Sequence, residues 1–263
     1  MAACGFNLIE LKESHLAEAK NLYEKQCSFF PLIAAVLERK QDGRVFCDRE
    51  EKPKAFYVEH CFGNAQIFGD VSSDFLASLC DYLLVKKSFQ VNKVRLYTPH
   101  EPTFLSAPTF DSIRSERQRF VISNPSSISA TKLENFTTRL LKWSDLPLLS
   151  EELINLTRFW RTEKDFCENS HAVIACRGLH PVAICYSAAT ANNRAEIDVC
   201  TLTKFRRLGL GRAVLSAFVQ NCSQIGVIPL WDCFTNNFGS MALAQAGGFK
   251  PKGASYSLYT IPG

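Results

Sequence analysis

The residues most able to do chemistry lie in the segment FRRLGLGR, Phe205 to Arg212. Its two glycines permit close approach of a ligand to the backbone because they carry no Cβ. The first turn of a following helix leaves about four amide N–H groups without intrahelical acceptors, and the helix dipole adds partial positive charge there. Three arginines surround the turn: Arg206, Arg207 and Arg212. The pattern predicts a site for a phosphate or pyrophosphate group.

Two common phosphate-binding motifs are excluded by their own spacing rules. A dinucleotide fingerprint requires Gly or Ala where Val214 stands, and a shorter, less polar strand-to-helix turn than this one. A nucleoside-triphosphate loop requires G-x-x-x-x-G-K-[ST], which the sequence does not contain.

The elements that must position this turn follow from hydrophobic periodicity. In the second half, NFTTRLLKW, HAVIACR, VAICYSAAT and VIPLWDC read as strands, as do EIDVCTL before the turn and ASYSLYTI at the end. Helices are expected over SDLPLLSEELINLTRFW, opened by Ser144 or Asp145, over the segment from Gly209 to Gln224, and over NFGSMALAQAGG. The segment DFCEN is expected in a loop. The order β-α-β-β-β-α-β-α-β predicts a mixed sheet of the α+β or α/β class.

The first half has a similar mixture of elements. The expected helices are SHLAEAKNLYEKQ, with Ser14 as N-cap, and SDFLASLCDYLLVKK, opened by Ser73 or Asp74. Five segments read as strands: RVFCD, KAFYVEH, AQIFGD, KVRLYT and RQRFVIS. This half has no glycine-rich turn, so a structural role is expected for it.

The Pro- and Ser-rich run SNPSSISATK, Ser123 to Lys132, predicts a linker. It divides the chain into an N-terminal α/β domain, residues 1–125, and a C-terminal domain, residues 132–263.

Composition limits the class of protein. With 46% hydrophobic residues and a net charge of +4 over 263 residues, the chain is a globular protein whose charge is too mild to indicate nucleic-acid binding. The 11 cysteines include no C-x-x-C pair, which argues against a structural metal and favours free thiols in a reducing compartment. Without a signal peptide or a long apolar run, a cytoplasmic location is expected.

The turn R-x-x-G-x-G, preceded by Phe205, resembles the acyl-CoA-binding turn of the GNAT acetyltransferase superfamily. The run from Asn237 to Phe249 resembles the later helix of that superfamily, and the element order agrees with it. More narrowly, Phe159-Trp160, EID, PLWDC and N-x-x-S-x-x-L-A resemble the branch that includes the zwittermicin A resistance acetyltransferase. The resemblance implies a GNAT fold with a splayed central sheet in the second half. It also implies that the first half is a degenerate, GNAT-like copy.

The resemblance further implies that acetyl-CoA is bound, with no metal. Its pyrophosphate is expected on the amides of Arg207 to Arg212, and its pantetheine arm along the end of the preceding strand. An amide near Cys200 or Thr201 is the expected donor to the tetrahedral oxyanion. The implied cofactor-binding residues are Cys200, Thr201, Leu202, Thr203, Arg206, Arg207, Leu208, Gly209, Leu210, Gly211, Arg212 and Asn237.

Transfer of an acetyl group to an amine requires a proton acceptor. Glu196 is the first candidate, at nearly the distance from the turn that the general base has in the histone-acetylating branch, and Asp198 is the second. Strand periodicity puts both on one face, with Ile197 and Val199 on the other. The alternative interpretation is that both are ordinary exposed carboxylates of a strand without a catalytic role. The family's tyrosine acid is replaced by Ala244, which leaves Ser240, water or no acid for the thiolate.

The expected function is N-acetylation of a primary amine, on a small molecule or a protein, by direct attack on the thioester. Glu163, Asp165 and Glu168 are expected to border the acceptor cleft. The alternative is a non-catalytic acyl-CoA-binding or partner-binding module, and nucleic-acid binding is a third, weaker hypothesis. The sequence does not identify the acceptor or the oligomeric state.

Overall fold

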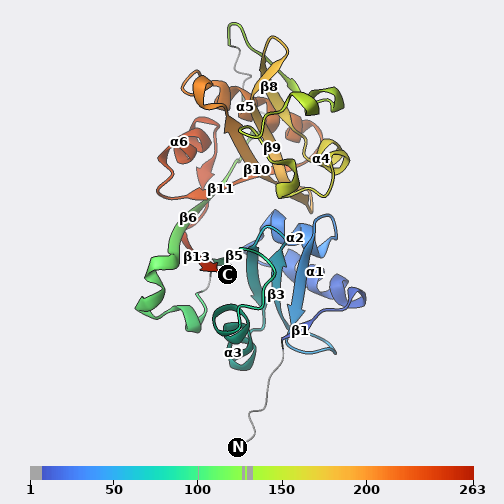
Figure 1. Ribbon diagram of the computed structural model, residues 1–263, viewed down its shortest axis with the longest axis vertical. Helices are drawn as coiled ribbons and strands as arrows, with labels where there is room; N and C mark the ends of the chain where they lie inside the picture. The colour runs from blue at the N-terminus through green and yellow to red at the C-terminus, as the bar shows by residue number, and fades with distance from the viewer. Residues whose placement is uncertain (1–7, 100, 126–127, 129–132) are drawn as a thin grey trace, which may run out of the picture. The chain divides into compact units, whose positions relative to one another are not determined.

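The computed structural model describes residues 8–99, 101–125, 128 and 133–263, and the chain forms two compact units (Figure 1). Unit 1 contains the residues up to Arg117 together with Tyr256–Gly263, and unit 2 contains Gln118–Ser255. These bounds differ from those of the two domains expected from the sequence, so that assignment stays a prediction. Part of the expected linker, residues 126–127 and 129–132, lies outside the described residues.

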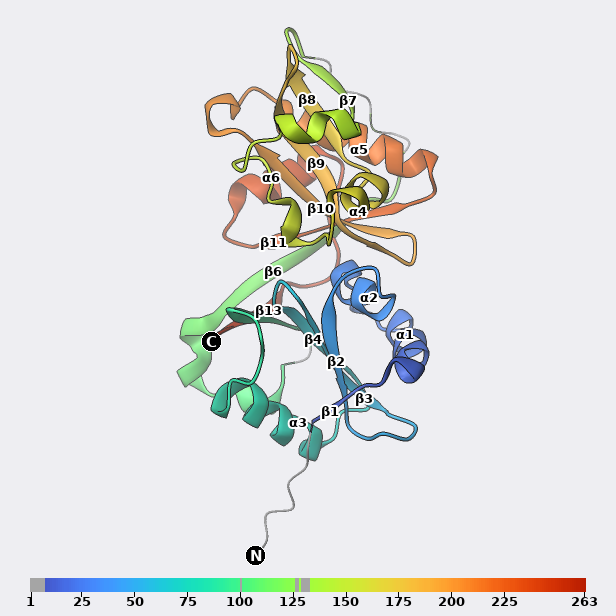
Figure 2. The ribbon, with the colours of Figure 1, turned by 45° about the vertical axis from the view of Figure 1, so that its right-hand side comes forward.

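Unit 1 contains strands β1 to β5 and β13, with helices on both faces of the strands (Figure 2). The strands are β1 (Ile9–Glu10), β2 (Gly43–Cys47), β3 (Ala55–His60), β4 (Asn64–Gly69), β5 (Lys93–Thr98) and β13 (Tyr256–Pro262). The helices are η1 (Glu13–His15), α1 (Leu16–Glu24), α2 (Pro31–Leu37), α3 (Ser73–Cys80), the π-helical turn η2 (Asp81–Val85), η3 (Thr103–Leu105) and η4 (Pro108–Ile113).

Unit 2 contains β7 to β12, and strand β6 contributes residues to both units. The strands are β6 (Arg114–Val121), β7 (Thr137–Leu140), β8 (Val173–Arg177), β9 (His180–Ala191), β10 (Arg194–Thr201), β11 (Ile228–Phe234) and β12 (Lys250–Pro251). The helices are η6 (Trp143–Leu148), η7 (Leu156–Arg158), α4 (Glu163–Asn169), η8 (Thr203–Phe205), α5 (Leu210–Gln224) and α6 (Phe238–Ala246).

The two units repeat one strand topology. Unit 1 has the order β1-β2-β3-β4-β5-β13-β6, and unit 2 has the order β7-β8-β9-β10-β11-β6 with β12 also paired to β6. In unit 1 the first four strands pair antiparallel and β4 pairs parallel with β5. In unit 2 the strands β7 to β10 pair antiparallel and β10 pairs parallel with β11. The repeated order and directions support the expectation that the first half is a copy of the second.

Each unit is completed by a strand from the other half of the chain. The last strand of the chain, β13, pairs antiparallel with β5 and with the start of β6 in unit 1 (Figure 1). The end of β6, which belongs to the first half of the sequence, lies beside β11 and pairs antiparallel with β12 in unit 2. The side chains follow the backbone, because Tyr259 and Ile261 are buried in the core of unit 1 whereas Phe120 and Ile122 are buried in the core of unit 2.

The expected strands are confirmed, and the differences concern helix ends and short helices. Helix α1 begins after His15, so Ser14 is not its N-cap; α3 is capped by Ser72, whose side chain accepts from the amide of Phe75, not by Ser73 or Asp74. Pro31–Leu37 forms helix α2, which was not expected from the sequence. All its residues are apolar and buried, so it lacks the alternation of polar and apolar residues that marks a surface helix.

The long helix expected from Ser144 to Trp160 is wrong. The segment forms the short 3₁₀-helices η6 and η7, and Pro147 lies inside the first of them. Proline removes a backbone donor and its ring obstructs a continuing α-helix. Asp145 turns back to cap this turn and pairs with Arg139 at 2.6 Å. DFCEN, expected in a loop, is helical instead in α4, with Thr162 as a side-chain N-cap.

His60 is buried in unit 1 as a neutral imidazole. Its Nδ1 atom accepts a hydrogen bond from the Phe62 amide at 3.0 Å, and its Nε2 atom lies 3.0 Å from Oε1 of Gln41. That oxygen accepts only, so the ring hydrogen is on Nε2 and protonation of Nδ1 would break the other bond. Burial lowers the pKa of His60 from 6.5 to about 4, against a smaller opposite effect of Asp42.

This histidine predicts acid sensitivity. Because the folded-state pKa lies below the unfolded one, its stabilising contribution is complete above pH 6.5 and is lost as the pH falls towards 4. We expect His60 to reduce the unfolding free energy by about 2 kcal/mol between pH 7 and pH 5. Urea unfolding at both pH values checks this: His60→Gln should remove that part of the difference, and the exposed His180→Gln should not. Equal pH dependence in the wild type and His60→Gln would contradict it.

Candidate functional site

The turn between β10 and α5 has the backbone that its glycine predicts. Gly209 is the N-cap of α5 with a φ of 81°, in the left-handed region that favours glycine. Arg207 also has a positive φ, 66°, which is unusual for a side chain of its size. These two reversals turn the chain from the end of β10 into a helix whose N-terminus has no side-chain cap.

The amides at this turn are available for a ligand. Within the described part of the chain, no protein group accepts a hydrogen bond from the amides of Arg207 to Arg212, whereas the next amide, of Ala213, donates to Gly209 O at 3.0 Å. The side chains of Arg206, Arg207 and Arg212 are exposed around these amides. Unpaired donors, the helix dipole and three cationic side chains combine into an anion-binding turn.

Two exposed side chains contact the end of β10, where the pantetheine arm was expected. Oε1 of Glu152 accepts from the Thr203 amide at 2.6 Å, and Nε of Arg206 donates to the Thr201 carbonyl at 3.3 Å. The amide of Thr203 lowers the pKa of Glu152 by stabilising its carboxylate. Sequence reasoning missed Glu152, because no local pattern connects it with a residue so far along the chain.

Strands β10 and β11 separate before the chain reaches this turn. Their parallel pairing covers Arg194↔Ile228, Ala195↔Pro229 and Glu196↔Leu230, and it ends there although both strands continue. The expected splay therefore begins at Glu196. Beyond this point β10 keeps its partner β9 as far as Thr201, so the side of β10 that faces β11 has main-chain groups for an added extended ligand.

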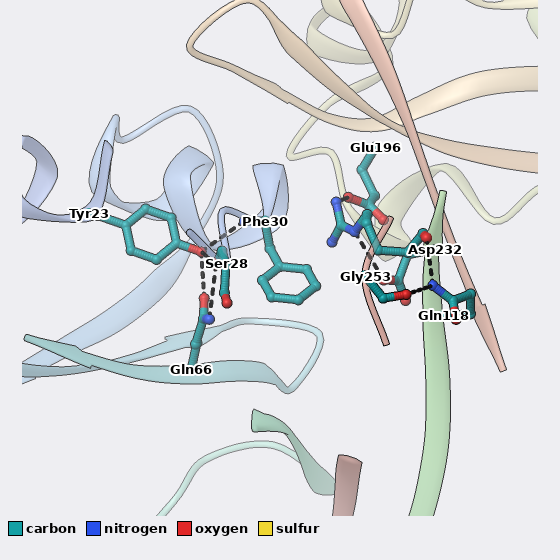
Figure 3. A network of polar contacts seen from close by, with 9 residues as sticks. Tyr23, Ser28, Phe30, Gln66, Gln118, Glu196, Asp232 and Gly253 are labelled. Atoms are coloured by element: carbon teal, nitrogen blue, oxygen red, sulfur yellow. Dashed lines mark hydrogen bonds and ion pairs between the residues drawn. The ribbon is translucent and has the colours of Figure 1, made fainter. Parts of the chain in front are cut away.

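Glu196 lies in a buried row of charges at the start of the splay (Figure 3). Nη1 of Arg119 is 3.3 Å from Oε2 of Glu196, and Nε of Arg119 is 3.1 Å from Oδ2 of Asp232. Only 10% of the side-chain surface of Glu196 and of Arg119 is exposed, and none of that of Asp232. The row contains two carboxylates and one guanidinium, so its formal charge is −1.

Asp198, the second candidate base, has different neighbours. Its Oδ2 atom accepts a hydrogen bond from the Tyr186 hydroxyl at 2.8 Å and lies 3.6 Å from Nη1 of Arg158. Burial, and then the carboxylate of Asp198, raises the pKa of Tyr186 well above its ordinary value, so the phenol stays a donor. Ile197 and Val199 pack in the core with α5, as the strand period predicts.

Helix α6 places the remaining expected residues. Oδ1 of Asn237 accepts from the amide of Ser240 at 3.0 Å and caps the helix, which leaves the amide group of the same side chain for a ligand. Ala244 is fully buried in the core of unit 2. A side chain at that position faces the core, so no acid comes from it. Ser240 is partly exposed near the start of the helix.

A cavity of about 840 Å³ lies within unit 2, along the segment between β7 and α4. Its lining combines apolar side chains, among them Leu146, Ile154 and Trp160, with polar and charged ones that include Glu151, Arg161 and Glu163. Nε1 of Trp160 donates to the carbonyl of Ser187 on β9 at 3.2 Å, which fixes this wall to the sheet.

The other two expected acidic residues near the cavity are engaged elsewhere. Asp165 accepts from the hydroxyl of Thr162 at 2.8 Å, and Glu168 lies 4.0 Å from Nζ of Lys164. Of the three carboxylates expected at the acceptor cleft, Glu163 is therefore the one that the cavity lining contains.

The corresponding place in unit 1 is closed by its own side chains. There the parallel pairing of β4 with β5 ends at Gln66↔Tyr97, so Gln66 has the position that Glu196 has in unit 2. Tyr23 donates to Oε1 of Gln66, and Nε2 of Gln66 donates to the carbonyl of Ser28 at 3.0 Å (Figure 3). An amide replaces the carboxylate, and the helix after β4 is capped by Ser72, so unit 1 has neither part of the candidate site.

Among the residues that the structure describes, no cluster of three or more His, Cys, Asp or Glu side chains is arranged to hold a metal ion. In the same ranges, none of the helices combines the length and the apolar character needed to cross a bilayer.

The cap on α6 yields a test that separates folding from binding. Asn237→Ala removes the acceptor for the Ser240 amide and should lower the unfolding free energy by about 1 kcal/mol. Asn237→Asp keeps an acceptor there and should retain the wild-type stability. Thermal or urea unfolding of both variants measures the difference; equal destabilisation by Ala and Asp would contradict this role of the cap.

Comparisons with known proteins agree with this architecture. The model of the GNAT acetyltransferase family matches residues 21–259. The uncharacterized N-acetyltransferase YdfB of Bacillus subtilis strain 168 is 27% identical over 275 residues, which cover 96% of this chain and 98% of that protein.

Solved structures show the same fold over both units. A GCN5-related N-acetyltransferase-like protein from Streptococcus suis 89/1591 has a TM-score of 0.67 at 17% identity, covering 94% of this chain and 98% of its own. A tandem GNAT protein from the clavulanic acid biosynthesis pathway has a TM-score of 0.67 at 11% identity, covering 97% and 98%. The chain therefore belongs to the GNAT acetyltransferase family and is an enzyme of that family, with the mixed α/β fold expected from its sequence.

Proposed function

We propose that the protein transfers an acetyl group from acetyl-CoA to a primary amine, and that unit 2 performs the reaction. The observation that carries the proposal is the turn at Gly209, whose amides have no protein acceptor in the described chain and which follows the part of β10 that has separated from β11. Membership of the family supports acetyl-CoA as the donor.

In this proposal the pyrophosphate of acetyl-CoA binds the amides from Arg207 to Arg212, including those of Leu208, Gly209, Leu210 and Gly211. The pantetheine arm extends along Cys200, Thr201, Leu202 and Thr203, and the amide of Asn237 holds it from the other side. Binding then displaces Glu152 from the Thr203 amide and Arg206 from the Thr201 carbonyl. Both side chains are on the surface, so the exchange is inexpensive.

The reaction we propose forms one C–N bond and breaks one C–S bond. A neutral amine attacks the thioester carbonyl, and an amide near Cys200 or Thr201 stabilises the oxyanion. Glu196 removes the amine proton directly or through one water, and Asp198 is the alternative base. The coenzyme A thiolate leaves and takes a proton from water or Ser240, because Ala244 offers none.

We assign the acceptor to the cavity beside Trp160. Its apolar side chains suit the body of an amine, and the carboxylates of Glu151 and Glu163, set against the cation of Arg161 on the lining, suit a cationic group. The narrower relation to the zwittermicin A resistance acetyltransferase stays a hypothesis. We also propose that residues 1–125 form a non-catalytic domain and that residues 132–263 form the catalytic one. A cytoplasmic location is a further hypothesis, which the free thiols of the described cysteines favour.

The second candidate function is a non-catalytic acyl-CoA-binding or partner-binding module. The position of Ala244 favours it, because no side-chain acid is supplied there. Release of free thiol from acetyl-CoA, measured with a broad set of amines, separates the two functions. Binding of acetyl-CoA with background thiol release for every amine would support the module.

Gly209→Asp tests the anion-binding turn. The new carboxylate would cap the free amides itself and repel the pyrophosphate, at about 4 kcal/mol for charges 4 Å apart at an effective dielectric of 20. We expect the Kd for acetyl-CoA, measured by calorimetry, to rise at least about 100-fold. Gly226→Asp is the matched control, because Gly226 has a φ of 72° at the other end of α5 with open space around it. Unchanged affinity in Gly209→Asp would refute the placement.

Glu196→Gln tests the proposed base. The amide keeps the size of the side chain but cannot accept the proton, so kcat should fall about 100-fold or more while the KM for acetyl-CoA changes little. Steady-state thiol release measures both. Asp198→Asn serves as the comparison and should lower kcat by less. A larger loss in Asp198→Asn than in Glu196→Gln would transfer the role to Asp198.

A further inference from the structure

Three neighbouring strands of unit 2 each contribute one charged side chain to the same row. The strand order is β6-β11-β10, and the side chains are Arg119, Asp232 and Glu196 in that order. The middle strand contributes the residue with no exposed side-chain surface. The row therefore crosses the sheet at the place where β10 and β11 begin to separate.

Alternation along the strands explains why these three residues meet. On β6, Phe120 packs into the core with α5, so the preceding residue, Arg119, lies on the opposite face. On β11, Trp231 and Cys233 belong to that core, and on β10, Ala195 and Ile197 do. Asp232 and Glu196 each lie between the two core residues of their strand, and Arg119 directly precedes Phe120, so each charge lies on the face away from α5.

Arg119 holds the two carboxylates with different nitrogens. Its Nε–H group is directed at Asp232 and its Nη1 group at Glu196, at 3.1 and 3.3 Å. A guanidinium is a rigid plane, so fixing one edge on Asp232 fixes the direction of the other edge towards Glu196. The backbone of Arg119 is fixed as well, because its carbonyl accepts from the Lys252 amide at 2.8 Å.

We infer that Arg119 is a positioning residue for the proposed base, and that Asp232 in turn holds Arg119. This inference rests on the proposed function. It gives the first half of the chain a part in the reaction, because β6 reaches unit 2 by the exchange of strands. The contact with the buried guanidinium restricts the side-chain torsions of Glu196, which orients its carboxylate towards the acceptor amine.

The experiment measures kcat and both KM values by thiol release in the full-length protein, with acetyl-CoA affinity determined separately by calorimetry. Arg119→Met keeps the apolar stem and removes the guanidinium. Arg119→Met combined with Asp232→Asn keeps the formal charge of the row at −1, so one buried carboxylate lacks the guanidinium instead of the two in the single variant. Arg119→Lys keeps one positive charge without the plane. Arg114→Met is the control, because Arg114 is an exposed arginine of the same strand that donates to Ser257 in unit 1.

We expect kcat to fall about 100-fold in Arg119→Met and in the double variant, since displacement of a catalytic group by about 1 Å costs that much. The KM and Kd for acetyl-CoA should stay within about twofold, and Arg119→Lys should recover part of the loss. Arg114→Met should behave as the wild type. If Arg119→Met does not fold, the kcat values of the double variant and of Arg119→Lys test the inference in its place.

A double variant that binds acetyl-CoA and retains the wild-type kcat would overturn the inference and leave the proposed function intact. A loss confined to the KM for acetyl-CoA would also overturn it. A wild-type protein that binds acetyl-CoA but acetylates no amine would instead overturn the proposed function, and with it this inference.

Discussion

The site depends on a set of amide donors that the fold leaves without protein acceptors. A helix N-terminus normally satisfies part of this demand with a side-chain cap, as Ser72 does at α3, Thr162 at α4 and Asn237 at α6. At α5 the N-cap is Gly209, which has no side chain to offer. A bound anion can then accept the hydrogen bonds for which the chain provides no acceptor. The divergence of β10 from β11, which begins at Glu196 and extends to the end of β10, gives the rest of an acyl-CoA molecule an extended place to lie.

The two units have the same strand topology but differ in the residues at the position of the candidate site. Unit 1 keeps the parallel strand pair that ends after its third register position, but Gln66 stands at the place of Glu196 and is engaged by Tyr23 and Ser28. The first half of the sequence still contributes to unit 2, because the end of β6 supplies Phe120 to the core of unit 2 and Arg119 to the charged row. Exchange of final strands thus makes each unit's structure dependent on the other half of the sequence.

Local features were predictable from the sequence, and long-range ones were not. The period of two in EIDVCT and the paired glycines of the turn depend on neighbouring residues, so β10 and α5 were predicted correctly. The spacing of the leucines predicts one helix through Pro147, but proline lacks the amide that a continuing α-helix needs, so the segment forms short 3₁₀-helices. No local signal says which sheet a strand joins, so the exchange of β6 and β13 was missed. The importance of Arg119 was missed for the same reason, since it lies 77 residues before Glu196.

The central claim is that the amides at the start of α5 receive the pyrophosphate. Titration of the ¹⁵N-labelled protein with acetyl-CoA, followed through the amide resonances of Leu208 to Arg212, tests it most directly. The account predicts that these resonances shift downfield and saturate together with the affinity measured by calorimetry, while amides at the far end of α5 stay in place. Saturable binding that shifts a different set of amides and leaves these unchanged would contradict it.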